Sequence, residues 1–169
     1  MLGYGSLSGS YAGVWDTRGP SFHIDSKVER LNIHQGNVKD MKVAMTYETG
    51  KLDVMATVEN EQMQGGVLLA YDLSDSLNFL STRGQLRIDE LAAFGLDIKG
   101  GQEALETSFE IIHAGQENKS FTNLSLTDFK YTCDTATFTI DKISMEDNQK
   151  GDHNTTTLKS DVVDLFISG

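Results

Sequence analysis

Apolar and polar residues alternate along most of this chain, and no other feature constrains the fold as much. The stretch VKDMKVAMTYETGKLDVMATVEN, residues 38–60, shows the alternation on both sides of a Thr-Gly pair. Successive side chains of a β-strand point to opposite faces, so a period of two puts the apolar residues on one face. A short glycine-containing turn between two such runs indicates a hairpin. The hairpin's apolar face covers either a sealed core or a surface kept for an apolar ligand.

The same alternation continues to the end of the chain and predicts about ten strands separated by polar or glycine turns. The best helical window, Ile88–Leu96, has ambiguous apolar spacing, and we expect a strand with a bend there. Long consecutive strands with short turns favour a meander over a Greek key. We expect Trp15 to cap one strand end, with an exposed binding tryptophan as the alternative.

Charge and composition exclude several classes of partner. The chain has 169 residues, 38% of them hydrophobic, and a formal net charge of -11. Such an acidic chain is a poor ligand for nucleic acid or for anionic lipid headgroups, so no nucleic-acid partner is expected. No apolar run approaches the ~18 residues of a membrane-spanning helix, and we expect the chain as given to be soluble. We expect residues 1–169 to form a single β-rich segment.

The chain shows no pattern typical of a catalytic or metal site. Its four histidines are not at metal-ligand spacing with one another or with Cys133, the only cysteine. No Ser-His-Asp grouping is indicated, and no carboxylate pair stands out among the 25 acidic residues. We therefore expect neither an enzyme nor a cofactor or metal site.

Several phrases, taken in order, resemble the TamB family within the AsmA-like group of envelope proteins of diderm bacteria, in the long form of Bacteroides-type bacteria. The first runs from GSLSGSYAGVWD through the hairpin ending in VMATVEN. The second is GVLLAYDLSDSLNFLSTRGQLRIDELAAFGL, and the third is TTTLKSDVVDLFISG at the end. The likeness covers most of the chain but not the family's C-terminal region, so it implies an internal segment of a much longer, repetitive protein.

The resemblance implies an architecture and a location. Members of the family form a long sheet curled into a U-shaped open groove with an apolar interior, called a β-taco. The family is associated with phospholipid movement between the inner and outer membranes and with outer-membrane protein assembly. For this chain the resemblance implies a periplasmic segment of a protein anchored in the inner membrane outside the segment.

The expected function is that of a periplasm-spanning bridge whose groove shields phospholipid acyl chains during transport and outer-membrane biogenesis. Two alternatives stay open. The groove could act as a chaperone for an outer-membrane protein strand, with an outer-membrane assembly protein as partner, or the chain could be a closed β-sandwich binding module of the adhesin kind. The predicted groove-lining residues are Met41, Val43, Met45, Tyr47, Leu52, Val54, Val58, Val67, Leu69, Tyr71, Leu86, Ile88, Phe138, Ile140, Leu165 and Ile167.

Overall fold

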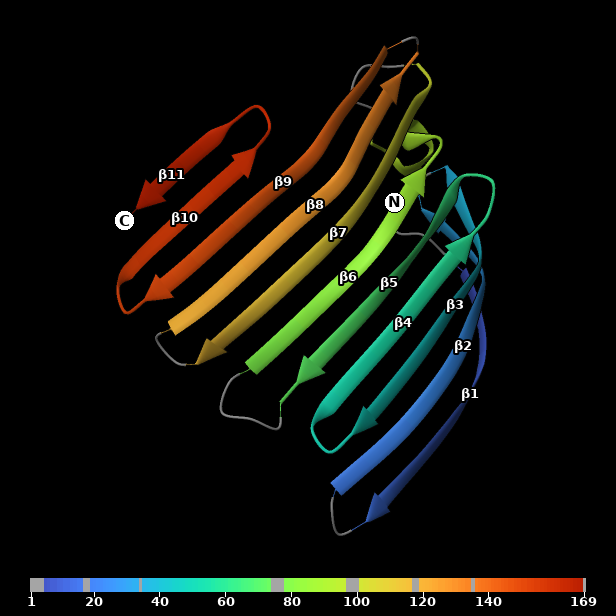
Figure 1. Ribbon diagram of the computed structural model, residues 1–169. Helices are drawn as coiled ribbons and strands as arrows, with labels where there is room; N and C mark the ends of the chain where they lie inside the picture. Colours follow the sequence, from blue (N-terminus) through green and yellow to red (C-terminus); the bar gives the residue numbers. More distant parts are fainter. Residues whose placement is uncertain are drawn as a thin grey trace.

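A computed structural model shows a single open sheet of eleven strands (Figure 1). It describes residues 5–16, 19–33, 35–73, 78–96, 101–116, 119–134 and 136–168. One short 3-10 helix, η1 (Leu91–Phe94), lies between the sixth and seventh strands. The strands are β1 (Gly5–Asp16), β2 (Gly19–Ile33), β3 (Gly36–Glu48), β4 (Lys51–Glu59), β5 (Met63–Asp72), β6 (Asn78–Ile88), β7 (Glu103–Gln116), β8 (Lys119–Cys133), β9 (Ala136–Lys150), β10 (His153–Ser160) and β11 (Asp164–Ser168).

The sheet is a meander in which every strand pairs antiparallel with the next strand of the sequence. The hairpin that the sequence predicts over residues 38–60 is β3–β4, whose turn residues Thr49 (φ 50°) and Gly50 (φ 80°) are both left-handed. Two left-handed residues match the right-handed twist of the flanking strands, as in type I′ hairpin turns. The predicted all-β, open and curled meander is confirmed, whereas the closed β-sandwich is wrong because all strands of the described ranges belong to one open sheet.

The register places the apolar residues of neighbouring strands side by side. Along β4, half-buried and exposed residues alternate without a break. Paired residues of an antiparallel sheet share a face, so one row of side chains can be followed across the sheet. That row crosses ten strands through Ile24, Met45, Val54, Leu69, Thr82, Ile111, Leu124, Met145, Leu158 and Leu165.

β-Bulges interrupt the alternation in the long strands. Asp40 in β3 and Asp128 in β8 have φ angles of 56° and 54°, in the left-handed region. An extra residue in one strand shifts the side chains that follow it to the other face, and Asp tolerates this conformation better than most residues. The register of the sheet shifts between Ser6 and Leu7 in the β1–β2 pairing and between Glu106 and Ser108 in the β7–β8 pairing, where Asp128 and Phe129 of β8 stand opposite Thr107. Across Asp40 the β2–β3 register continues without a shift.

The bulges also explain why the sheet curls. A bulged strand bends and twists more strongly than a regular one. The register shifts between β1 and β2 and between β7 and β8 lie toward the ends of these strands that approach η1. In Figure 1 the same ends of β1–β3 curve behind β4 and β5, while the opposite ends of the strands stay spread apart. We call the edge of the sheet that carries η1, Gln35 and the turn of residues 60–62 the capped rim.

The helix η1 closes the capped rim, and the predicted bent strand over Ile88–Leu96 is wrong. The main-chain nitrogen of Gln35, in the β2–β3 turn, donates to the carbonyl oxygen of Ala93 at 2.9 Å. A Cβ atom on Gly36 would meet the Phe94 ring at 2.6 Å, so the ring packs directly on the backbone. Because Gly36 shares a face with Val38, η1 lies on the apolar side of the sheet, which is the concave side at this rim.

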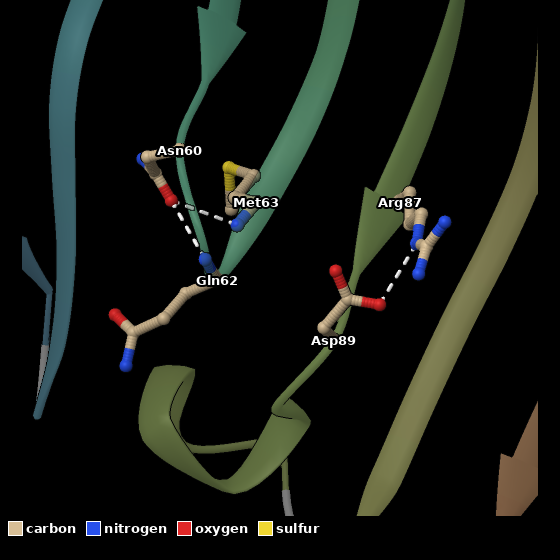
Figure 2. A network of polar contacts seen from close by, with 5 residues as sticks. All are labelled: Asn60, Gln62, Met63, Arg87 and Asp89. Carbon is tan, nitrogen blue, oxygen red and sulfur yellow. Dashed lines mark hydrogen bonds and ion pairs between the residues drawn. The ribbon is translucent and has the colours of Figure 1, made fainter.

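The turn between β4 and β5 connects η1 at the capped rim to the rest of the sheet (Figure 2). The Asn60 side-chain oxygen accepts hydrogen bonds from the main-chain nitrogens of Gln62 and Met63, both at 2.9 Å. Gln62 in turn accepts from the main-chain nitrogen of Asn37 at 3.0 Å and donates to the Glu90 carboxylate at 3.1 Å. One side chain thus connects β3 with the segment that leads into η1.

Only a small core is buried, and it lies mostly at the capped rim. The buried apolar residues of the described part are Val38, Ile88, Leu91, Ala93 and Ile140. The accessible surface is 11510 Å², whereas a compact monomer of this mass would expose about 8,200 Å². The excess shows that the sheet is one layer thick.

Replacement of Asp128 tests the bulge. Asp128→Val places a β-branched residue at a positive φ, and we expect the free energy of unfolding to fall by about 1–2 kcal/mol, while Asp128→Gly is close to neutral. Urea unfolding followed by circular dichroism measures both variants. Thr127→Val is the matched control on the neighbouring residue. A loss for Asp128→Val no larger than that of the control would contradict the bulge.

Truncation of Leu91 tests the closure of the rim. Leu91 is 2% exposed, and we expect Leu91→Ala to lower the free energy of unfolding by about 2–4 kcal/mol through the cavity that it leaves. Leu68→Ala removes the same atoms from a half-exposed position and should cost less than about 1 kcal/mol. Equal losses in chemical denaturation would show that η1 does not stabilise the sheet.

Candidate apolar binding surface

All of the predicted groove-lining residues fall on one face of the sheet, which we call the apolar face. In β3 and β4 the pairs are Met45 with Val54 and Tyr47 with Leu52. The neighbouring strands continue the face with Val67, Leu69 and Tyr71 of β5, Leu86 and Ile88 of β6, Phe138 and Ile140 of β9, and Leu165 and Ile167 of β11; Met41, Val43 and Val58 complete it.

The structure adds to this face apolar residues that the predicted groove lining does not include. They share the rows of the predicted residues because their strands pair in register, and only long-range pairing reveals this. They are Phe22, Ile24 and Val28 of β2, Leu105, Phe109 and Ile111 of β7, Leu124, Leu126 and Tyr131 of β8, Ile143 and Met145 of β9, and Leu158 of β10. The face is therefore continuous from β2 to β11.

The apolar face changes character toward the rim opposite η1. The row of paired side chains that contains Phe22 and Tyr47 lies toward that rim. In the N-terminal half this row is aromatic, and the stacked Phe22 and Tyr47 rings have centroids 5.2 Å apart. From β7 to β10 the same row is polar, and it ends at Ile167 in β11. There His113 and Thr122 are hydrogen-bonded at 2.8 Å, and the Thr156 hydroxyl donates to the Asp147 carboxylate at 2.6 Å. The C-terminal half thus has an apolar middle bordered by hydrogen-bonding groups.

A buried acid stands at the capped rim on the same face. Glu103, 1% exposed, begins β7 and pairs with Cys133 in the register. The Tyr131 hydroxyl donates a hydrogen bond to the Glu103 carboxylate at 2.6 Å. This bond, assisted by desolvation and by the negative charge of Glu103, raises the pKa of Tyr131 far above its ordinary value. The Tyr131 hydroxyl thus gives the buried Glu103 carboxylate a hydrogen-bond donor on a face that is otherwise apolar.

The opposite face is polar and rich in ion pairs. Lys27 and Asp40 approach to 2.6 Å, and this pairing lowers the pKa of the Asp40 carboxyl and raises the pKa of Lys27. Arg87 and Asp89 pair at 2.8 Å (Figure 2). A shallow depression of about 430 Å³ lies near Met55 and Leu68, beside Arg83. It is a local hollow, whereas the apolar face runs across the sheet.

Comparisons with known proteins name no relative. No protein-family model matches the chain, and no curated protein or solved structure matches it. Within the described ranges, no helix is long and apolar enough to span a membrane. In the same ranges, no group of three or more His, Cys, Asp or Glu residues is placed to hold a metal ion. The fold and the surface define a class, namely single-layer, open antiparallel sheets with one apolar face.

The Glu103–Tyr131 pair predicts a pH dependence of stability. Because the folded state raises the pKa of Tyr131, its contribution is complete below the ordinary tyrosine pKa near 10 and is lost as pH rises above it. Tyr131→Phe should lower the urea midpoint at neutral pH, since the buried Glu103 carboxylate loses the hydrogen bond from the Tyr131 hydroxyl. It should also flatten the fall in stability between about pH 9 and 11. Parallel pH profiles of the two proteins would contradict the pairing.

Proposed function

We propose that the apolar face shields the acyl chains of phospholipids, as a segment of a periplasm-spanning bridge would do during lipid transport from the inner to the outer membrane. The observation that supports this best is the continuity of the face across ten strands, from Ile24 in β2 to Leu165 in β11. In the described part of the chain, no second layer covers it. Large exposed apolar patches on soluble proteins mark interaction sites.

The apolar face is long enough, measured across the strands, for an extended and flexible ligand. Neighbouring strands lie about 4.8 Å apart, so ten strands extend the row by roughly 45 Å. An extended acyl chain can lie along this direction and shift by one strand while it stays in contact with equivalent side chains such as Met45, Val54 and Leu69. Methionines adapt to chains of different shape because the thioether is flexible and polarizable.

Energetics explain why such a surface would be needed. Each CH₂ group removed from water gains about 0.8 kcal/mol, so two chains of about sixteen carbons gain roughly 25 kcal/mol against bare water. A lipid therefore does not cross water unaided at a useful rate. On a continuous apolar face the chains remain covered at every step, and movement along the face is close to isoenergetic.

The polar border suggests where the headgroup would lie. On the apolar face, the polar part of the row toward the rim opposite η1 consists of His113, Thr122, Asp147 and Thr156. A headgroup beside this row keeps its hydrogen bonds to water and protein while the chains lie toward the middle of the sheet. At the capped rim, Leu91, Ala93 and Phe94 close the face instead.

A pair of neighbouring substitutions tests the proposal. Val54 lies on the apolar face, while Met55 lies on the opposite face and is 48% exposed. Val54→Asp puts a carboxylate in the path of the acyl chains, and we expect binding of fluorescent phosphatidylethanolamine to weaken roughly tenfold or more. Met55→Asp adds the same charge in the same strand and should bind as the wild type does. Equal binding by all three proteins would contradict the proposal.

Photo-crosslinking in the cell distinguishes the ligands. A crosslinking amino acid at Met45, Val54 or Leu69 should give phospholipid adducts, whereas Lys42 and Asp53, on the opposite face, should give none. Protein adducts at the first set would favour the chaperone alternative, in which an unfolded strand occupies the face. An absence of adducts at the first set would overturn lipid shielding.

A further inference from the structure

The polar part of the row toward the rim opposite η1 contains two ionisable side chains, each bonded to a threonine of a neighbouring strand. The His113 Nδ1 atom and the Thr122 hydroxyl oxygen are 2.8 Å apart, and the Thr156 hydroxyl donates to the Asp147 carboxylate at 2.6 Å. All four side chains are half-buried. A side chain that a second hydrogen bond already orients loses less conformational entropy when it binds a ligand.

Each ionisable group keeps one atom for a ligand. Thr156 bonds to the Oδ1 atom of Asp147, and within the described residues the Oδ2 atom accepts no hydrogen bond. In the same residues the His113 Nε2 atom has no partner, and it lies 3.3 Å from the place of a Cβ atom added to Gly115. Glycine at that position therefore leaves Nε2 uncovered. With the Thr122 hydroxyl as donor to Nδ1, Nε2 carries the ring proton and can donate it to an anion.

The neighbouring rows of the apolar face add no further charge. Nearer the rim, the next row is small or uncharged and consists of Gly115, Ser120, Gln149 and Asn154. Toward the middle of the sheet, the next row is apolar and consists of Ile111, Leu124, Met145 and Leu158. The polar row thus holds one carboxylate and one imidazole, and it borders directly on the path proposed for the acyl chains.

We propose that this row binds the headgroup of an aminophospholipid, with the primary ammonium group on Asp147 and the phosphate on His113. The inference rests on the proposed function, which places the acyl chains on the apolar face, and adds the chemistry of the headgroup. Two strand spacings, roughly 10 Å, separate Asp147 from His113. A hydrogen bond of about 2.8 Å at each end leaves roughly 4 Å for the ligand. That spacing suits a phosphate oxygen and an ammonium nitrogen linked through two carbons.

Charge complementarity selects this headgroup over other phospholipid headgroups. The chain has a formal net charge of -11, and Asp147 lies in the row itself, so a headgroup that carries only the phosphate charge is repelled. A quaternary ammonium group is a cation, but it has no N–H bond to donate to the Asp147 carboxylate. A primary ammonium group supplies both the charge and the donor, and such charge-assisted hydrogen bonds are stronger than neutral ones.

The N-terminal half of the sheet presents different chemistry at the same rim. There the row carries no charged side chain and consists of Phe22, Tyr47, Leu52, Tyr71 and Leu80. Trp15 lies on the same face and is 81% exposed, so the expectation that it caps a strand end is wrong. Aromatic rings pack against acyl chains but give a phosphate no positive partner. The proposed headgroup site is therefore confined to β7–β10 (Figure 1).

Lipids with the same acyl chains test the headgroup. We expect phosphatidylethanolamine to bind at least about fivefold more tightly than phosphatidylcholine or diacylglycerol. Asp147→Asn keeps an acceptor for the Thr156 hydroxyl but removes the charge, and it should abolish this preference. Glu146→Gln is the matched control, because Glu146 is next in the strand, is exposed and lies on the opposite face. It removes the same charge and should keep the preference.

The outcomes separate this inference from the proposed function. Equal binding of the three lipids, or a preference that persists in Asp147→Asn, would overturn the headgroup site while the shielding of acyl chains stands. Loss of the preference in Glu146→Gln as well would show that net charge, and not Asp147, selects the lipid, and would also overturn the site. If none of the three lipids binds, the proposed function fails, and a lipid as the occupant of this row fails with it.

A soluble headgroup tests the site without acyl chains. Glycerophosphoethanolamine carries the phosphate and the primary ammonium group but no acyl chain. We expect it to shift the imidazole NMR signals of His113 with half-saturation on the order of 10 mM, and Asp147→Asn to weaken this shift. His23 lies on the opposite face and its signals should stay unchanged. Unchanged His113 signals, or equal shifts of His23, would overturn the inference even if lipids bind the apolar face.

Discussion

Two left-handed aspartates in the long strands, Asp40 in β3 and Asp128 in β8, are the constraint on which the rest of this sheet depends. Without Asp40 and Asp128 in that conformation, strict alternation would send Val38 and Tyr131 to the polar face. The bulges keep the apolar residues of the long strands on one side and bend those strands toward it. The curl then brings the β2–β3 turn close enough to η1 for Gln35 to bond with Ala93.

Closure at one rim and exposure elsewhere follow from the lengths of the strands. β4, β5 and β6 are shorter than β2, β3 and the strands β7 to β9, and the connection after β6 places η1 beside their ends. Leu91 and Ile88 are buried there, whereas Phe138 and Leu165 keep about half of their surface exposed on the same face. The protein thus has a small anchored core and a broad apolar surface with no layer over it in the described residues.

Sequence reasoning succeeded where the structure is local and failed where it is not. The alternation in Met41 to Tyr47 fixes which residues share a face, and the pairing of β3 with β4 agrees. The helix at Leu91–Phe94 lies in the best helical window of the sequence, Ile88–Leu96, but the apolar spacing there is ambiguous. The contacts with Gln35 and Gly36 that hold the helix are more than fifty positions away. The left-handed Asp40 did leave a signal, the three-residue spacing of Val38 and Met41 around an aspartate, which departs from strict alternation.

Methyl NMR with a spin-labelled fatty acid tests the open apolar face most directly. Met41, Met45, Met63 and Met145 lie on that face, and Met55 lies on the other. With methionine methyl groups labelled, the account predicts that the added acyl chain broadens the Met45 and Met145 signals and leaves the Met55 signal sharp. Unchanged signals at all five positions, or equal broadening of Met55, would contradict an open apolar face that takes up acyl chains.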